Sequence, residues 1–264
     1  MKTIVITGST RGIGYGAADQ LLARGCQVMI SGRNPSTVDE AVSALAKQHG
    51  GERVAGQACD VTDYAQVQAL WDAAARRFSS VDIWVNNAGQ GNLLAPLWEQ
   101  DPAIMRSVVD TNVLGTLYGC KVAINGMLKQ GHGHLYNIEG FGSRGGTTVA
   151  GLTLYGTSKA GLSFLDKSLA AELKDKPVKV SSILPGMVLT DLLLNQRSGD
   201  PAEWERSKWI YNILADKVET VTPWIADQVL AEHKNGAHIA WLTGGKVMLR
   251  FLTARFHRRH IIDE

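Results

Sequence analysis

Two residues of the chain, Tyr155 and Lys159, have the side chains and the spacing for proton transfer. Residues four positions apart lie on one face of a helix, so a helix here would place a phenol beside an ammonium group. A free tyrosine has a pKa of about 10 and exchanges protons poorly near neutrality. A nearby cation favours the phenolate and lowers that pKa, so we expect Tyr155 to act as a general acid. An isolated pair of this kind is usually a coincidence on a helix surface, so the rest of the chain decides its meaning.

A glycine-rich stretch near the start of the chain has the composition of a phosphate-binding turn. It follows a run of β-branched and apolar residues and consists of Gly8, Ser9, Thr10, Arg11, Gly12, Ile13 and Gly14. Glycines at a strand-to-helix turn let backbone amides approach a pyrophosphate at the helix N-terminus. We therefore expect a dinucleotide at this turn. A tight corner without a ligand is the alternative for such a turn taken alone.

The end of the second expected strand favours NADPH over NADH. The strand runs into Ser31-Gly32-Arg33, where an NAD-binding protein usually has a carboxylate for the adenosine ribose hydroxyls. No acid is present there, and Arg33 together with Arg11 could pair with the 2′-phosphate of NADPH. The alternative is that both arginines are simply solvated.

The elements that must position these residues alternate between strands and helices. Amphipathic stretches such as Ser36–His49 and Tyr64–Phe78 predict helices between short apolar runs. Strands that are apolar on both sides and are separated by helices require a parallel sheet covered on both faces, so we expect an α/β, Rossmann-type, doubly wound fold. The expected strands are Thr3–Thr7, Gln27–Ser31, Arg53–Ala58, Ile83–Asn86, His134–Ile138, Lys179–Leu184 and Ala237–Leu242.

Length and patterning indicate a single domain. The chain has 264 residues, of which 45% are hydrophobic, and shows no internal repeat or Pro/Ser-rich linker. We expect residues 1–130 mainly to bind the cofactor and residues 131–264 to carry catalysis and substrate binding. The strand-helix rhythm breaks at about residues 190–216, in a segment that could close over a substrate as a lid or form two ordinary packing helices. Its candidate substrate contacts are Leu192, Leu193, Trp204 and Trp209.

Composition argues against several classes of protein. A formal net charge of +2 is too small for a general nucleic-acid binder. Three well-separated cysteines suggest neither a disulfide framework nor a zinc site, and His132 and His134 lack further ligands nearby in sequence, so we expect no metal. The cysteine usage fits a reducing, cytoplasmic compartment. No signal-peptide pattern precedes the first strand, and no apolar run approaches the roughly 20 residues that span a bilayer.

Taken together, the motifs resemble the short-chain dehydrogenase/reductase family over essentially the whole chain. The resemblance rests on their order and spacing: TGSTRGIG from Thr7, Cys59-Asp60-Val61, Asn86-Asn87-Ala88-Gly89, Asn112, Tyr155 with Lys159, and Pro185-Gly186. It implies an NADPH-dependent carbonyl reductase. It also implies cofactor contacts from Asp60, Val61, Asn87, Ala88, Gly89, Pro185, Gly186, Val188 and Thr190.

The same resemblance implies how the catalytic residues work. Hydride would pass to a carbonyl carbon while Tyr155 protonates the oxygen and Ser143 donates a second hydrogen bond to it. Lys159 would also bind the nicotinamide ribose, and Asn112 would sustain a proton relay through Lys159. A dinucleotide sensor or scaffold without catalysis is the alternative from another class, since a fold does not fix an activity.

Two residues depart from the family pattern. Ser143 lies twelve residues before Tyr155 rather than the more usual thirteen. Glu139 stands where the family usually has serine, near the carboxyl end of a central strand, where open α/β sheets bind ligands. Glu139 could be a second acid or a substrate contact, but we expect it to hydrogen-bond a loop backbone and to have no chemical role.

The second half of the chain resembles the chlorophyll b reductase branch of the family. The resemblance rests on HLYNIEGFGSRGG from His134, YGTSKAGL, LPGMVLTDLLL and the ending FLTARFHRRH. It implies reduction by NADPH of the 7-formyl group of chlorophyll(ide) b to 7-hydroxymethyl, with a hydrophobic tetrapyrrole as substrate. Another bulky ketone, aldehyde or alcohol is the alternative substrate for the same machinery.

Two surfaces could bind partners. The segment Lys246–His260 carries five lysines and arginines and no acid among apolar residues, so it could lie on an anionic membrane, or be a solvated helix or an interface tail. Long amphipathic helices expected at Ile104–Gln130 and Leu154–Lys174 resemble the family's dimerising surfaces, so we expect a homodimer or homotetramer.

Overall fold

Seven strands with apolar residues on both faces form one parallel sheet in the order β3-β2-β1-β4-β5-β6-β9. The computed structural model describes residues 1–143, 145, 148–195, 201–231, 233–255 and 259–262, without the side chains of residues 201–203 and 206. The order reverses beside β1, and ligands of open α/β sheets bind at such a switch point, beyond the carboxyl ends of the strands. The strands are β1 (Thr3–Ile6), β2 (Gln27–Gly32), β3 (Val54–Ala58), β4 (Ile83–Asn86), β5 (Gly133–Ile138), β6 (Val178–Leu184) and β9 (Ala237–Ala240).

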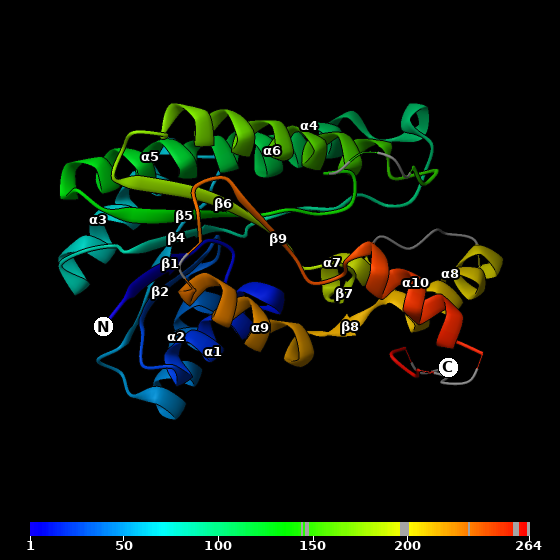
Figure 1. Cartoon of the computed structure of the whole chain (residues 1–264), viewed down its shortest axis with the longest axis horizontal. Helices are drawn as coiled ribbons and strands as arrows, with labels where there is room; N and C mark the ends of the chain where they lie inside the picture. Colours follow the sequence, from blue (N-terminus) through cyan, green and yellow to red (C-terminus); the bar gives the residue numbers. More distant parts are fainter. Residues whose placement is uncertain (144, 146–147, 196–200, 232, 256–258, 263–264) are drawn as a thin grey trace.

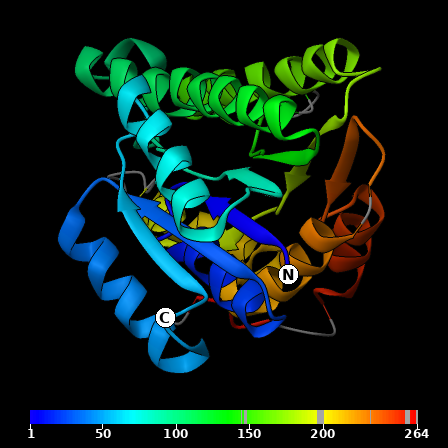
Figure 2. The same cartoon turned by 90° about the vertical axis from the view of Figure 1, so that its left-hand side faces the viewer.

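Helices cover both faces of the sheet, which confirms the predicted doubly wound fold (Figures 1 and 2). Alternation along β1 shows the two cores: Ile4 and Ile6 pack with one set of helices, and Val5 packs with the other. Among the described residues, no helix is both long and apolar enough to cross a membrane. The helices on the first face are α1 (Gly12–Ala23), α2 (Pro35–His49) and α9 (Val218–Leu230), and those on the second are α3 (Tyr64–Phe78), α4 (Pro102–Val109), α5 (Gly115–Gln130) and α6 (Thr153–Glu172).

The single helix expected over Ile104–Gln130 is interrupted. Between α4 and α5 the chain makes a π-helical turn at Asp110–Leu114. Such turns are rare and are frequent at functional sites. Here the turn contains the fully buried Asn112, so the π-helical turn positions a predicted catalytic residue.

The segment around residues 190–216, where the alternation of strands and helices is interrupted, forms short strands and helices at one end of the molecule. β7 (Val188–Leu189) pairs in parallel with β8 (Asp216–Lys217), and between them lie α7 (Asp191–Leu194) and α8 (Pro201–Leu214). Helix α10 (Gly244–Thr253) lies beside α8 (Figure 1). The helices fit the expectation of packing helices, and closure over a substrate remains a prediction.

A buried carboxylate, Asp216, fixes this end of the molecule. Its side chain is 3% exposed and accepts hydrogen bonds from Arg250 at 2.8 and 3.0 Å. Arg259 donates a further bond at 2.6 Å, and so does the indole of Trp241. The C-terminal segment is therefore held to β8 by charge-assisted bonds, which are stronger than neutral ones.

Candidate active site

The glycine turn after β1 has the shape that a phosphate needs. Gly8 and Gly12 have positive φ angles of 61° and 59°, which favour glycine. A side chain on Gly8 would lie 2.8 Å from the Cα atom of Ala88. Helix α1 begins directly after this turn, and no side chain caps its N-terminus, so its first amide groups are free to bind an anion. These features fit a dinucleotide pyrophosphate.

Asn87 holds the glycine turn in place. Its Nδ2 atom donates to the carbonyl oxygens of Thr7 and Gly8, both at 2.9 Å. The hydroxyl oxygen of Thr7 accepts from the backbone amides of Asn87 and Ala88. The motif after β4 therefore positions the phosphate turn through its side chain and backbone.

Ser9 is structural rather than exposed to a ligand. Its side chain is fully buried, donates to the carbonyl of Ile6 and accepts from the amide of Ser31. Thr10 lies against Gly32, where any side chain would come within 2.7 Å of its methyl group. The hydroxyl of Ser9 thus joins the ends of β1 and β2, a role that the sequence motif did not reveal.

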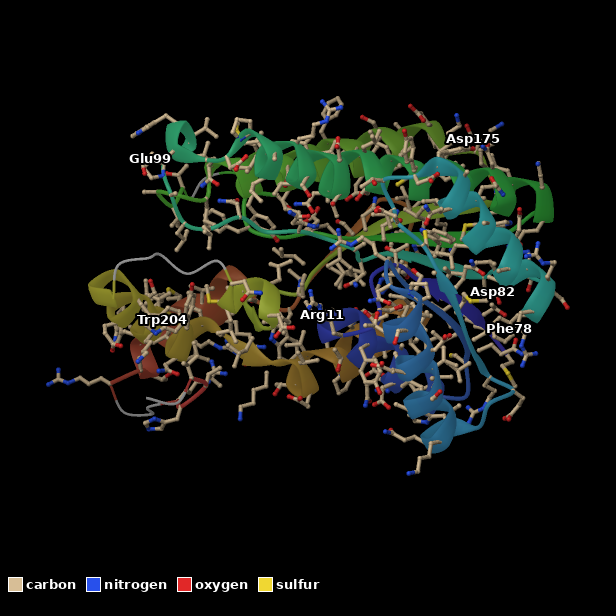
Figure 3. All side chains as sticks on the ribbon, turned by 180° about the vertical axis from the view of Figure 1, so that it is seen from behind. Arg11, Phe78, Asp82, Glu99, Asp175 and Trp204 are labelled. Atoms are coloured by element: carbon tan, nitrogen blue, oxygen red, sulfur yellow. The ribbon has the colours of Figure 1, made fainter. Side chains whose placement is uncertain are left out.

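The two predicted phosphate-binding arginines do not point to the same partner. Arg33 is exposed directly after β2. Arg11 pairs instead with Asp191 at the start of α7, at 3.2 Å, and both side chains are largely exposed (Figure 3 labels Arg11). Exposed pairs contribute little, so Arg11 is only weakly held. Arg33 is the better candidate for recognising a 2′-phosphate.

The remaining motifs reach the same edge of the sheet. Val61 is buried against Gly115, and the carboxylate of Asp60 accepts from the amide and hydroxyl of Thr62. The chain after β6 turns at Gly186, where φ is 77°. It then brings the methyl group of Thr190 to 3.5 Å from the position of a side chain on Gly12. Pro185 and Val188 are buried in the same stretch.

Tyr155 and Lys159 lie on α6 as predicted, with the side chains turned toward the end of β5. The Tyr155 hydroxyl would be 2.5 Å from a side chain on Gly140, so only glycine fits there. Lys159 is buried, and its ammonium donates to the carbonyl of Ile138 at 3.1 Å. Gly89 adjoins the same ammonium, 3.7 Å from the position of its absent side chain. The site therefore joins β4, β5 and α6.

The pKa of Tyr155 differs from the sequence expectation. Burial raises the pKa of Tyr155 to about 12, whereas the expected effect of the lysine was to lower it. Burial also lowers the pKa of Lys159 to about 8, opposed by the charges of Glu139 and Asp166. Desolvation disfavours the charged form of each group. Tyr155 in the chain alone is a protonated phenol, the form that a general acid for reduction requires.

Asn112 supports the catalytic helix. Its Nδ2 atom donates to the Gln90 carbonyl at 2.8 Å and to the Ser158 hydroxyl at 2.9 Å, and its Oδ1 accepts from the Gln90 amide. Ser158 in turn donates to the carbonyl of Tyr155. Asn92 caps the same helix by accepting from the amide of Tyr155. Sequence reasoning missed Gln90, Ser158 and Asn92, because their partners lie far away in the chain.

The hydroxyl of Ser143 is engaged with backbone. It accepts from the amide of Gly140 at 3.1 Å and donates to the carbonyl of Lys159 at 3.2 Å. The side chain is buried. Its single proton is therefore in use, and the predicted bond to a substrate oxygen requires the hydroxyl to rotate.

The four residues predicted to contact the substrate lie on two helices with different surroundings. Leu192 and Leu193 are half-buried on α7, close to the Thr190 turn. Trp204 and Trp209 lie on α8, where Trp209 is 60% exposed and its ring is 6.0 Å from that of Phe251 on α10 (Figure 3 labels Trp204). A role in binding substrate remains a prediction for all four. In the part of the chain that the structure describes, no group of three metal-binding side chains is found.

A buried carboxylate beside the site, Asp166, gives a prediction for stability. Burial raises its pKa to about 7, and Asn137 donates to only one of its oxygens. A raised pKa means that stability is fully present below the unfolded value near 4 and is lost as pH rises through about 7. Relative to wild type, Asp166→Asn should therefore gain on the order of 2 kcal/mol of stability between pH 5 and pH 8. Urea unfolding at pH 5 and pH 8 measures the free energy of unfolding of both proteins. The same change with pH in both would contradict the prediction.

This fold and this site define an oxidoreductase. The model of the family described as "short chain dehydrogenase" matches residues 2–201, and the chain belongs to that family. Members act on CH–OH and C=O groups with a nicotinamide cofactor. Two chloroplastic relatives described as chlorophyll(ide) b reductase NOL are each 38% identical to the chain. The one from Oryza sativa subsp. japonica aligns over 95% of this chain and 74% of its own length, and the one from Arabidopsis thaliana over 99% and 77%.

A solved structure shows the same fold with a cofactor bound. A variant of the protein ElxO with NADPH bound superposes with a TM-score of 0.80 at 26% identity, covering 94% of this chain and 99% of that one. The likeness supports a nicotinamide cofactor for this fold.

Proposed function

We propose that this protein uses NADPH to reduce the formyl group of chlorophyll(ide) b to a hydroxymethyl group. The observation that carries the proposal is the extent of the likeness to the chlorophyll(ide) b reductases. The family match ends at residue 201, but the likeness to these relatives covers nearly the whole chain. It therefore includes much of α8 to α10, the end of the molecule expected to select the substrate.

The residues around the glycine turn and the catalytic helix fit NADPH. The glycine turn and the uncapped α1 N-terminus would hold the pyrophosphate, and the exposed Arg33 would pair with the 2′-phosphate. Lys159 and the turn at Gly186 would hold the nicotinamide end. When bound there, NADPH supplies the hydride.

The protein's own residues would then complete the reduction. Tyr155 donates its phenolic proton to the carbonyl oxygen as the carbon is reduced. Lys159 lies on the same face of α6 and stabilises the phenolate that remains. Asn112, through Ser158, keeps the helix turn of Tyr155 in place.

The choice of cofactor gives a second prediction. Arg33→Ala should weaken NADPH binding about tenfold or more and leave NADH binding unchanged, because only NADPH carries the phosphate. Arg11→Ala is the matched control and should have a smaller effect, since Arg11 pairs with Asp191. Fluorescence titration with each cofactor measures both constants. An equal loss for NADPH and NADH in Arg33→Ala would remove this residue from phosphate recognition.

Purified protein with NADPH and chlorophyllide b tests the substrate. The pigment's absorption should shift to that of the 7-hydroxymethyl product as NADPH is consumed one for one. No shift above a sample without protein rejects this substrate. NADPH consumption with another bulky hydrophobic ketone or aldehyde alone would favour the alternative reductase, and none with any carbonyl would favour the dinucleotide sensor.

Peripheral membrane contact through the C-terminal segment remains a prediction, with a changed basis. Arg250 and Arg259 bind Asp216, and the Lys246 ammonium lies 3.2 Å from the centre of the Trp241 ring. Arg258 lies outside the described residues. Arg250, Arg259 and Lys246 are thus used within the protein, whereas Arg255 is exposed. Contact with a membrane would therefore depend on Arg255 and on exposed apolar side chains of α10: Met248, Leu249, Phe251 and Leu252.

Homodimer or homotetramer formation is also proposed. Exposed apolar side chains on α5 and α6, with Phe164 at 76% the most exposed of them, offer a contact surface. Light scattering after gel filtration would give the subunit number. The compartment stays a prediction, since the relatives named above are chloroplastic.

A further inference from the structure

A row of polar side chains crosses four neighbouring strands under α6. Asn86, Asn137, Ser182 and His238 are register partners on β4, β5, β6 and β9. Asn86 donates to Asn137 at 2.8 Å, and Ser182 lies 2.8 Å from Nδ1 of His238. Register partners share one face of a sheet. The row therefore runs from the interior to the edge strand β9, where the His238 side chain is 30% exposed.

Glu139 lies between this row and the catalytic lysine. It follows β5 two residues after Asn137, and its side chain is 1% exposed. The ammonium of Lys159 donates to Ile138, the residue directly before it. Nδ1 of His238 is 3.4 Å from Oε2 of Glu139, close enough for an ion pair but without the geometry of a hydrogen bond. The glutamate is thus in contact with the surface histidine, and its charge acts on Lys159 without a direct ion pair.

One carboxylate oxygen of Glu139 is buried without a hydrogen bond from any described residue. In the part of the chain that the structure describes, Oε2 of Glu139 and Oδ2 of Asp166 are buried atoms without a hydrogen bond. The sequence expectation, a bond from Glu139 to a loop backbone, is not observed among these residues. A buried oxygen without a hydrogen bond is costly, and such groups are retained mainly where they have a task. Asn112 does not serve Lys159 through its side chain, which is bonded to Gln90 and Ser158.

We propose that Glu139 and His238 form a proton-supply path that connects Lys159 to solvent at the β9 edge. The path is separate from Asn112. It rests on the proposed reduction, which removes one proton from Tyr155 in each turnover.

The proton steps balance along this path. The O–H bond of Tyr155 breaks as the product O–H bond forms. Lys159 gives an ammonium proton to the phenolate, and its amine takes a proton from the Glu139 carboxyl. Neither pair is in direct contact in the chain alone, so each transfer passes through one bridging water. His238 passes a proton to the carboxylate and is refilled by water, so each turnover consumes one solvent proton.

The charges around Lys159 fit this exchange. It faces Glu139 after β5 and Tyr155 and Asp166 on α6, and Cys120 of α5 lies beyond Asn137. Burial lowers the pKa of Lys159 to about 8, while the two carboxylates act to raise it. An amine with this pKa gains and loses protons readily near neutrality.

NMR titration of Lys159 in protein labelled with [13Cε]lysine tests the coupling without substrate. The resonance is assigned by its loss in Lys159→Arg. Glu139→Gln removes one negative charge and should lower the pKa of Lys159 by about one unit. Glu139→Asp keeps the charge and should restore most of the shift. An unchanged titration in Glu139→Gln overturns the proposal even if the pigment is not reduced.

Turnover of chlorophyllide b with NADPH tests the surface end. His238→Gln should slow turnover about tenfold and increase the solvent deuterium isotope effect, with NADPH affinity unchanged. The control is His132→Gln, since His132 is exposed and pairs with Asp82 at the opposite end of the sheet from Trp204 (Figure 3). His132→Gln should turn over chlorophyllide b at the wild-type rate and with the wild-type isotope effect. Wild-type turnover and isotope effect in His238→Gln overturn the path. A normal Lys159 titration shift with no pigment reduction in wild type rejects only the proposed substrate.

Melting curves separate these roles from a loss of folding. Glutamine has nearly the shape of glutamate but removes the charge that faces Lys159 and His238, so Glu139→Gln should melt somewhat lower than wild type and still unfold in one cooperative transition. A Glu139→Gln protein that unfolds cooperatively with an unshifted Lys159 contradicts the proposal.

Discussion

Tyr155→Phe should lose turnover by about a thousandfold while binding NADPH as wild type does. The variant keeps the ring and removes the phenolic proton assigned to the carbonyl oxygen, and a positioned general acid contributes roughly 100-fold to 10,000-fold. The backbone bonds from Asn92 and Ser158 to residue 155 do not involve the hydroxyl, so α6 should be unchanged. Initial rates of NADPH consumption and a fluorescence titration measure the two effects.

Tyr64→Phe is the control for this experiment. Tyr64 is exposed at the start of α3, and its ring meets Tyr118 edge-on, a contact that phenylalanine retains. Its turnover should equal that of wild type. Full activity in Tyr155→Phe would take this residue out of the mechanism.

Asp216→Asn should destabilise the protein by roughly 3–5 kcal/mol. The carboxylate is 3% exposed and neutralises Arg250 and Arg259, whose side chains are only 13% and 30% exposed. Removing one partner of a buried pair leaves the others buried without compensation. Urea unfolding measures the loss. Asp191→Asn, which breaks the exposed pair with Arg11, should change stability by less than about 1 kcal/mol.

The loss of stability caused by Asp216→Asn should depend on pH. Burial acts to raise the pKa of Asp216, but bonds from Trp241 and Arg250 and the charges of both arginines hold it below its usual range. A lowered pKa gives stability that is present above the unfolded value near 4 and is lost as pH falls through the folded value. The difference between wild type and Asp216→Asn should therefore shrink in strong acid. A difference that is the same at pH 3 and pH 7 would contradict a role for the charge.

The fold was predictable because its signals are local. The strands lie within two residues of their expected ends, and Tyr64–Phe78 is helical as predicted. The clear start of that helix comes from Asp63, whose carboxylate accepts from the amides of Ala65 and Gln66. The glycine turn was also evident, since positive φ angles require glycine there.

The contacts that decide the chemistry were not predictable in the same way. The Arg11 pair with Asp191 joins residues 180 positions apart, and no local pattern encodes it. The same holds for Asp216, which was not a candidate residue although three distant side chains converge on it. The pKa of Tyr155 was expected in the wrong direction because spacing shows the neighbouring lysine but not the burial.

Deuterium transfer tests the proposed reduction most directly. The protein is incubated with chlorophyllide b and NADPH that carries two deuterium atoms at C4 of the nicotinamide, and the pigment is analysed by mass spectrometry. We predict a hydroxymethyl product with one deuterium on the former formyl carbon, absent from a parallel sample of Tyr155→Phe. A product without deuterium, or no product with the wild-type protein, would contradict hydride transfer to this substrate.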